Sequence, residues 1–134
     1  MNNDRFTAAR FLTQTGHFSR TNNKVKRPAF MPAAKDNKAS IFDIENQTSA
    51  EVEECGRSHV LGPAVPKLYG FGKFHTDSVL SAGLMIEKAE PPPRHANIVN
   101  WPPPDEKEKQ ILIALQIADT ADLCLFDSII HYST

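Results

Sequence analysis

The sequence predicts a single α+β domain over residues 1–134, in which a small mixed or antiparallel sheet of about four to five strands packs against two main helices. A length of 134 residues fits one domain. Two segments, residues 47–60 and 104–122, carry helical periodicity and helix-start signals. The segments around them are short, apolar or alternating, and bounded by Gly, Pro, Asn or Ser, which is typical of strands and turns.

The N-terminal part is predicted to contain one strand, Ala8–Leu12, followed by a long loop. Residues from about 13 to 27 are rich in Thr, Asn, Ser and Gly, which let the backbone leave regular structure. We therefore expect an exposed loop here, either simply solvated or in contact with nucleic-acid phosphates. The loop is basic because it carries Arg20, Lys24, Lys26 and Arg27.

A hairpin is predicted next, between Ala29–Met31 and Ser40–Ile44. Pro28 and Pro32 suit strand ends or an edge, because proline has no N–H to donate to a ladder. The string SIFDI alternates with the period of two that is typical of strands.

The first helix is predicted from its N-terminal signal. The Thr48 side chain can accept from first-turn amides, and Glu51 three residues later completes a capping box. The Gly62–Pro63 pair ends the helix. Cys55 and His59 share one helical face, and we interpret them as a core thiol beside a half-buried imidazole. The alternative is a metal site. Zinc would need further ligands, which only His75 or Cys124 could add.

The string KLYGFGKF, residues 67–74, is predicted to form a strand interrupted at Gly70 and Gly72. Glycine inside a strand permits a bulge or the close approach of another backbone. The alternative, a phosphate-binding Gly-x-Gly loop, lacks the spacing of known nucleotide-binding motifs. One or two helical turns follow, with Thr76 as the cap and Gly83 as the stop, and then a strand before the prolines.

The second helix is predicted to begin at Pro104, where proline suits the first turn. Its apolar face is wide, which suggests packing against the sheet on one side and a further contact on another. That face comprises Ile111, Leu112, Ile113, Leu115, Ile117 and Ala118. A last strand is expected in the string ADLCLF.

The composition excludes several broad classes of protein. A formal net charge of -1 gives no overall attraction to nucleic acid or to acidic membranes. No apolar run is long enough to span a bilayer, and the first residues lack the apolar core of a secretion signal. Cys55 and Cys124, far apart, suit reduced thiols. We therefore expect a cytoplasmic protein without a metal or cofactor, for which a homo-oligomer is compatible with the sequence.

The candidate site lies in a loop predicted over residues 90–104, called here the proline-framed segment because Pro-Pro-Pro brackets it at both ends. Proline fixes the backbone, so the polar groups between the two brackets could be held in place at little entropic cost. Arginine clamps anions, histidine titrates near neutral pH, and asparagine both donates and accepts. The candidate binding residues are Arg94, His95, Asn97, Asn100 and Trp101.

A structural interpretation of the same segment stays open. In it, Ile98, Val99 and Trp101 fill the core, while Arg94 and His95 bond backbone carbonyls.

The string EPPPRHANIVNWP (90–102), together with FSRTNNKVKRPAFMP (18–32) and SIFDI (40–44), resembles a family of small uncharacterised bacterial proteins. Members pair a VKxxAFxP stretch with a PPPRHANIVxWP stretch close to the second helix. The resemblance implies a bacterial cytoplasmic protein from a mobile or accessory gene, and it directs attention to Arg94, His95 and Asn97. It implies no catalytic residue, cofactor or ligand.

Two functional hypotheses follow. The first is a non-enzymatic binding or interaction module that presents the proline-framed segment to a protein or nucleic-acid partner. The alternative is a small enzyme acting on a phosphate-containing or nucleic-acid substrate. In that enzyme His95 would be the general acid or base, Arg94 would stabilise negative charge, Asn97 would orient the substrate, and His75 would be a second titrating group.

Overall fold

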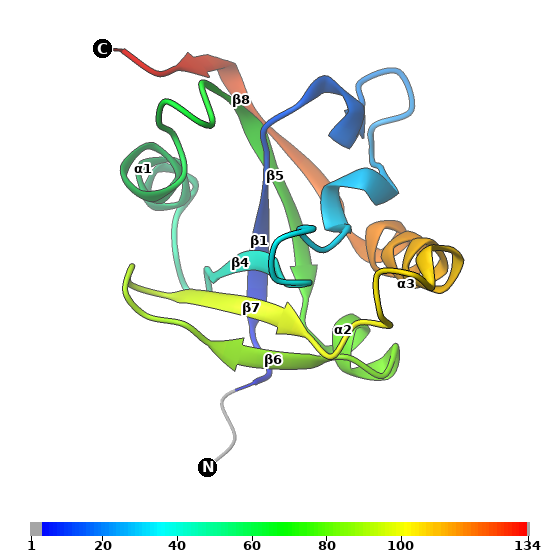
Figure 1. Cartoon of the computed structure of the whole chain (residues 1–134). Coiled ribbons are helices and arrows are strands. Elements are labelled where there is room, and N and C mark those ends of the chain that lie inside the picture. The colour runs from blue at the N-terminus through cyan, green and yellow to red at the C-terminus, as the bar shows by residue number, and fades with distance from the viewer. Residues whose placement is uncertain (1–3, 134) are drawn as a thin grey trace.

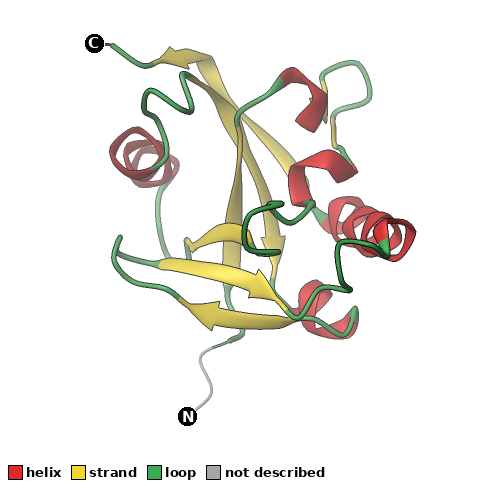
Figure 2. Ribbon diagram, in the orientation of Figure 1, coloured by secondary structure: helices red, strands yellow, loops and turns green. Residues whose placement is uncertain are grey.

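The computed structural model describes residues 4–133, which form an antiparallel six-stranded sheet, a separate two-stranded hairpin and helices on both sides of the sheet (Figures 1 and 2). This confirms the α+β prediction, with six strands where four to five were expected. The strands are β1 (Thr7–Leu12), β2 (Phe18–Ser19), β3 (Lys24–Val25), β4 (Ala39–Asp43), β5 (Lys67–His75), β6 (Met85–Lys88), β7 (His95–Val99) and β8 (Asp122–His131). The helices are η1 (Thr15–His17), η2 (Arg27–Phe30), α1 (Ser49–His59), α2 (Asp77–Ser81) and α3 (Lys107–Thr120).

The large sheet, in the order β6-β7-β4-β1-β5-β8, divides into two halves between β4 and β1. In Figure 1 the strands β1, β5 and β8 run steeply across the direction of β4, β7 and β6. All six residues of β1 pair with β5, but only Ala8 and Ala9 pair with β4. Beyond Ala9 the two halves therefore separate, and we call this opening the β1–β4 split.

Both faces of the sheet are covered, which explains why alternate residues of β1 enter different cores. Ala8 and Leu12 belong to the core that includes residues of η2, α2 and α3. Ala9 and Phe11 belong to the smaller core beneath α1. Two-sided burial accounts for the near-continuous apolar character of this central strand.

The helix α1 begins with the predicted capping box. The Thr48 side chain accepts from the Glu51 backbone amide, and the Glu51 carboxylate accepts from the Thr48 amide at 2.8 Å. The helix lies close to the sheet at Gly56, where a Cβ atom would come within 2.6 Å of the Leu68 side chain. These two features fix where α1 starts and how near it packs.

The close backbone approach predicted for the glycines of KLYGFGKF is confirmed at Gly70, whereas the extra, unpaired residues lie on β8, because Leu68 pairs with Ile130 and Gly70 with Leu125. The pairing of β5 with β8 shifts register between Leu68 and Gly70. A Cβ atom at Gly70 would lie 2.3 Å from the backbone oxygen of Cys124. Glycine is therefore needed there because the backbone of β8 approaches too closely for any side chain.

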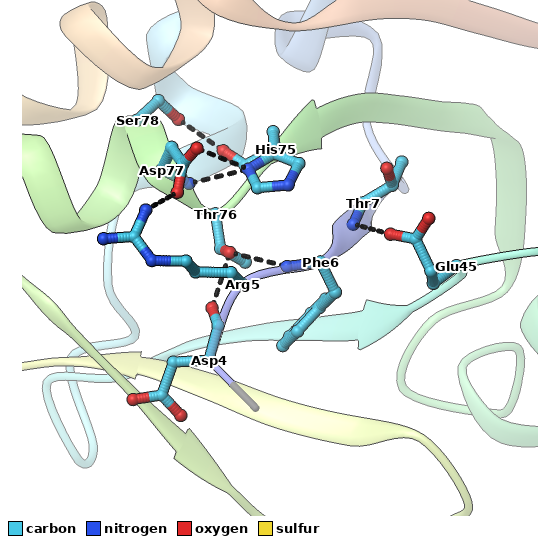
Figure 3. A network of polar contacts seen from close by, with 9 residues as sticks. All are labelled: Asp4, Arg5, Phe6, Thr7, Glu45, His75, Thr76, Asp77 and Ser78. Atoms are coloured by element: carbon cyan, nitrogen blue, oxygen red, sulfur yellow. Dashed lines mark hydrogen bonds and ion pairs between the residues drawn. The ribbon is translucent and has the colours of Figure 1, made fainter. Parts of the chain in front are cut away.

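Thr76 anchors the N-terminal segment to the end of β5, as Figure 3 shows. Its fully buried hydroxyl donates to the Asp4 carbonyl at 2.6 Å and accepts from the Phe6 amide at 3.0 Å. An ion pair between Arg5 and Asp77 reinforces this contact at the surface. Thr76 occupies the predicted cap position of α2, but its side chain makes no cap hydrogen bond because it serves these two partners instead.

The start of α3 lies at Lys107 rather than at the predicted Pro104, and three further predicted segments differ from the structure. Arg27–Phe30 is the 3-10 helix η2 rather than a strand, so the hairpin of Ala29–Met31 with Ser40–Ile44 is wrong; β4 pairs instead with β1 and β7. The basic loop at 13–27 contains η1 and the β2–β3 hairpin, whose Phe18 and Val25 side chains are buried.

The third difference concerns the proline-framed segment, which is not one loop. Its middle, His95–Val99, is the strand β7, paired on both sides with β4 and β6. Ala96 and Ile98 enter the core, while the alternate side chains lie on the other face of the sheet. The segment was predicted to be a loop. It forms a strand because pairing with β4 and β6 gives its backbone N–H and C=O groups hydrogen-bond partners.

Candidate ligand-binding pocket

Arg10 occupies the β1–β4 split. Its Nε donates to the Ala29 carbonyl at 2.5 Å, and one terminal guanidinium nitrogen donates to the Ser40 carbonyl at 2.6 Å. Burial lowers the pKa of Arg10 to about 10, so the group stays charged at neutral pH. Within residues 4–133 no carboxylate lies within ion-pair distance of it. The split is thus bridged by a cation that has hydrogen bonds but no counter-charge.

A pocket of about 450 Å³ opens beside this arginine, and we call it the split pocket. Among its lining residues are the cations Arg10 and Lys35 and two histidines, but no Asp or Glu. Its remaining lining is mostly apolar or hydroxyl-bearing. The full lining is Arg10, Phe11, Thr13, Lys35, Ser40, Phe42, His59, Val60, Val65, Pro92 and His95.

His95 enters this pocket in a defined orientation. Its Nδ1 lies 2.9 Å from the Ala89 carbonyl, which can only accept, so Nδ1 carries the proton. In the neutral ring Nε2 is then an acceptor, and it lies 2.7 Å from the Ser40 hydroxyl oxygen. The ring packs against Phe42, with 5.2 Å between ring centroids. Both ring nitrogens and one ring face are therefore fixed.

The prolines position this histidine through a tight turn between β6 and β7. The Ala89 amide donates to the His95 carbonyl at 3.0 Å, and the His95 amide donates to the Pro92 carbonyl at 3.2 Å. Pro92 itself lines the split pocket. The turn formed by the first proline bracket thus places the Pro92 ring and the His95 imidazole at the wall of the split pocket.

Arg94 points elsewhere, although it is adjacent to His95 in the chain. One of its guanidinium nitrogens lies 3.3 Å from the Asp43 carbonyl and 3.5 Å from the Glu45 carbonyl. The same nitrogen lies 3.8 Å from the Asp43 carboxylate. Arg94 does not line the split pocket, so the structure does not bring the guanidinium and the imidazole together.

The other three predicted site residues have separate surroundings. Asn97 hydrogen-bonds Glu87, whose pKa is lowered mainly by Lys38. The Asn100 side chain donates to the Gly83 carbonyl at 3.3 Å. Trp101 is buried and donates from its indole to the Ile98 carbonyl at 3.0 Å, as the structural interpretation expects. A ligand role for Arg94, Asn97, Asn100 and Trp101 stays a prediction.

Sequence reasoning did not select Arg10, Lys35 or Ser40. Arg10 stands inside an apolar strand pattern, and a cation in a strand buried on both faces is the one local sign of a special role. Ser40 and Lys35 carry no such sign, because the topology of the sheet alone brings them to His95. His59 is predicted from the sequence only as a half-buried neighbour of Cys55, and the structure places it at the split pocket.

Metal binding finds no support in the described part of the chain. No group of three or more His, Cys, Asp or Glu side chains in residues 4–133 could hold an ion. Burial raises the pKa of the Cys55 and Cys124 thiols, which favours their protonated forms.

No protein-family model, curated protein or solved structure matches this chain. In the described residues, no helix combines the length and apolar character needed to cross a bilayer. The chemistry of the site therefore rests on its own geometry.

The charge of Arg10 also acts on His17. This histidine is buried, and its Nδ1 accepts from the Thr13 amide at 3.2 Å. Burial, and secondly the positive charge of Arg10, lower the pKa of His17 to about 4. His17 is therefore neutral in the folded protein at pH values where an unfolded chain already protonates it.

We predict that His17 makes the protein less stable as the pH falls from about 6.5 to about 4. The unfolded state binds the proton across this window and the folded state does not, so the contribution, about 2 kcal/mol after allowance for solvent screening, is lost. In His17→Asn, the amide oxygen can still accept from Thr13 but does not titrate. Denaturant unfolding across this pH range should show a shallower loss of stability in His17→Asn; equal slopes in both proteins would contradict the prediction.

Proposed function

We propose that this protein is a binding module whose split pocket takes up a small anionic molecule with an apolar body. The observation that carries the proposal is the charge of the lining: Arg10 and Lys35 are present, and no carboxylate among the lining residues opposes them. This differs from the protein or nucleic-acid partner expected on the proline-framed segment, because the ligand is a small molecule in a pocket to which that segment contributes Pro92 and His95.

An anion would supply what Arg10 lacks. A cation taken partly out of water loses hydration, and its two carbonyl partners return only part of that free energy. A carboxylate or phosphate in the split pocket would add a charge-assisted contact in a region of reduced dielectric. Lys35, exposed at the pocket wall, would add a second cation.

The rest of the pocket wall suits an apolar group attached to that anion. Phe11, Phe42, Val60, Val65 and Pro92 all line it. A volume of about 450 Å³ lies within the range of small-molecule sites. A small aromatic or branched carboxylate, or a phosphate ester of similar size, would contact both the cationic and the apolar side chains of the pocket wall.

We predict that benzoate and phenyl phosphate raise the melting temperature by several degrees, while benzyl alcohol and benzylamine do not. A ligand that binds only the folded state stabilises it by about 2.7 kcal/mol at a hundred times its dissociation constant. Lys35→Ala should reduce the shift, and Lys67→Ala, which removes an exposed lysine outside the pocket lining, should leave it unchanged. Equal shifts with the neutral or cationic probes, or with Lys35→Ala, would contradict anion binding.

A second candidate is also an enzyme that uses His95 as its base, but with an ester in place of the phosphate-containing or nucleic-acid substrate, and one specific contact favours it. With Nδ1 of His95 donating to Ala89, Nε2 is placed to take the proton of the Ser40 hydroxyl. Ser40 would attack an ester carbonyl, Nε2 would pass the proton to the departing alkoxide, and water would then release the acyl group by the same base. Arg94 has no part in this version, because its guanidinium lies on the Asp43 and Glu45 carbonyls.

For this candidate the expected result is covalent labelling of Ser40 by a fluorophosphonate probe, detected by intact mass and peptide mapping. Ser40→Ala and His95→Asn should abolish the adduct, since one removes the nucleophile and the other the base. Ser58→Ala, which removes an exposed serine hydrogen-bonded to Glu54, is the matched control and should label fully. An unlabelled wild-type protein would leave the split pocket as a binding site alone.

A further inference from the structure

The exposed side of α3 carries apolar side chains that residues 4–133 cover only in part. Leu112 is 62% exposed and Leu115 is 42% exposed, whereas Ala114, Ile117 and Ala118 are buried. The wide apolar stripe predicted from the sequence is therefore only partly used by the core. The remaining part faces outward.

A second cavity of about 450 Å³ lies where this side of α3 meets the β2–β3 hairpin. Val25, Pro28 and Leu115 provide its apolar part, and Leu112 lies one helical turn before Leu115 on the exposed side of α3. We call Leu112 and the cavity lining together the hairpin–α3 surface. The cavity lining is Ser19, Asn22, Lys24, Val25, Lys26, Arg27, Pro28, Leu115 and Asp119, none of which lines the split pocket.

The charges around this cavity are unequal. Lys24 pairs with Asp119 at 3.3 Å across the opening between hairpin and helix. Lys26 and Arg27 are exposed and form no ion pair with any described residue. The rim therefore has an excess of positive charge, although the chain as a whole has a formal charge of -1.

The hairpin that carries these cations is held in shape before any partner arrives. Asn23 adopts a φ of 52° at the turn, and its amide donates to the Arg20 carbonyl at 3.2 Å. The Asn22 amide donates to the Ser19 hydroxyl at 3.1 Å, and the Lys26 amide donates to the His17 carbonyl at 2.8 Å. A preformed rim loses less entropy on binding than a flexible one.

We propose that the hairpin–α3 surface docks an acidic segment of a partner protein, with one apolar side chain of that segment entering the cavity against Leu115. Carboxylates of the segment then meet Lys26 and Arg27, and its neighbouring apolar side chain covers Leu112. Charge complementarity favours an anionic partner, and the exposed leucines favour a protein over a nucleic acid. Within residues 4–133, none of the side chains that line the cavity is an aromatic one that could stack on a base.

The test is selection of peptides from a random-peptide phage library on the wild-type protein, followed by fluorescence polarisation with the selected peptides. We expect peptides that combine Asp or Glu with Leu, Ile, Phe or Trp. Lys26→Glu and Leu115→Ser should each weaken binding by roughly tenfold or more. Lys67→Glu is the matched charge control, and Met85→Ser, at a 57% exposed side chain on β6, is the matched apolar control; both should bind as wild type.

Three results would overturn the proposal: no enriched peptide, peptides without the acidic and apolar combination, or affinities that Leu115→Ser does not change. Oligothymidylate is measured alongside. Binding of this strand that falls in Lys26→Glu but persists in Leu115→Ser would reassign the surface to nucleic acid. Because the two cavities share no lining residue, neither Lys26→Glu nor Leu115→Ser should affect the benzoate shift.

Discussion

The structure depends on Arg10, whose hydrogen bonds bridge the β1–β4 split. Past Ala9, β1 no longer pairs with β4, and a ladder that ends inside a sheet leaves backbone carbonyls in need of donors. Arg10 supplies a donor to the Ser40 carbonyl on β4, and its planar guanidinium reaches the Ala29 carbonyl on η2 at the same time. These two hydrogen bonds bridge the β1–β4 split beside the split pocket.

The same side chain sets the chemistry of its surroundings. Its charge helps to lower the pKa of His17 on one side, and on the other it faces a pocket without carboxylates. His95 and Ser40 reach that pocket from β7 and β4, and the Ala89 carbonyl fixes the orientation of the His95 ring, whose Nε2 lies beside the Ser40 hydroxyl. Arg10 thus has a part in both the structure and the proposed function. It donates hydrogen bonds across the β1–β4 split, and its positive charge would attract an anionic ligand to the split pocket.

The sequence predicts correctly those features that depend on residues close together in the chain. The Thr48–Glu51 capping box and the close backbone approach at Gly70 follow from residue types at short spacing, and both are confirmed. The strand β7 was missed because the flanking prolines outweighed a short alternation that buries Ala96 and Ile98. The role of Arg10 could not be predicted from the sequence, because its hydrogen-bond partners come from distant segments that only the sheet topology brings together.

The most direct test of this account is the free energy of unfolding of Arg10→Met and Arg10→Lys, measured in denaturant beside the wild type. Methionine fills similar space but leaves two carbonyls without their donor, so we expect a loss of about 3 kcal/mol or more. Lysine keeps the charge and lacks the planar fork, so its loss should be smaller. If Arg10→Met proves as stable as the wild type, the β1–β4 split does not depend on this arginine and the role proposed for Arg10 is wrong.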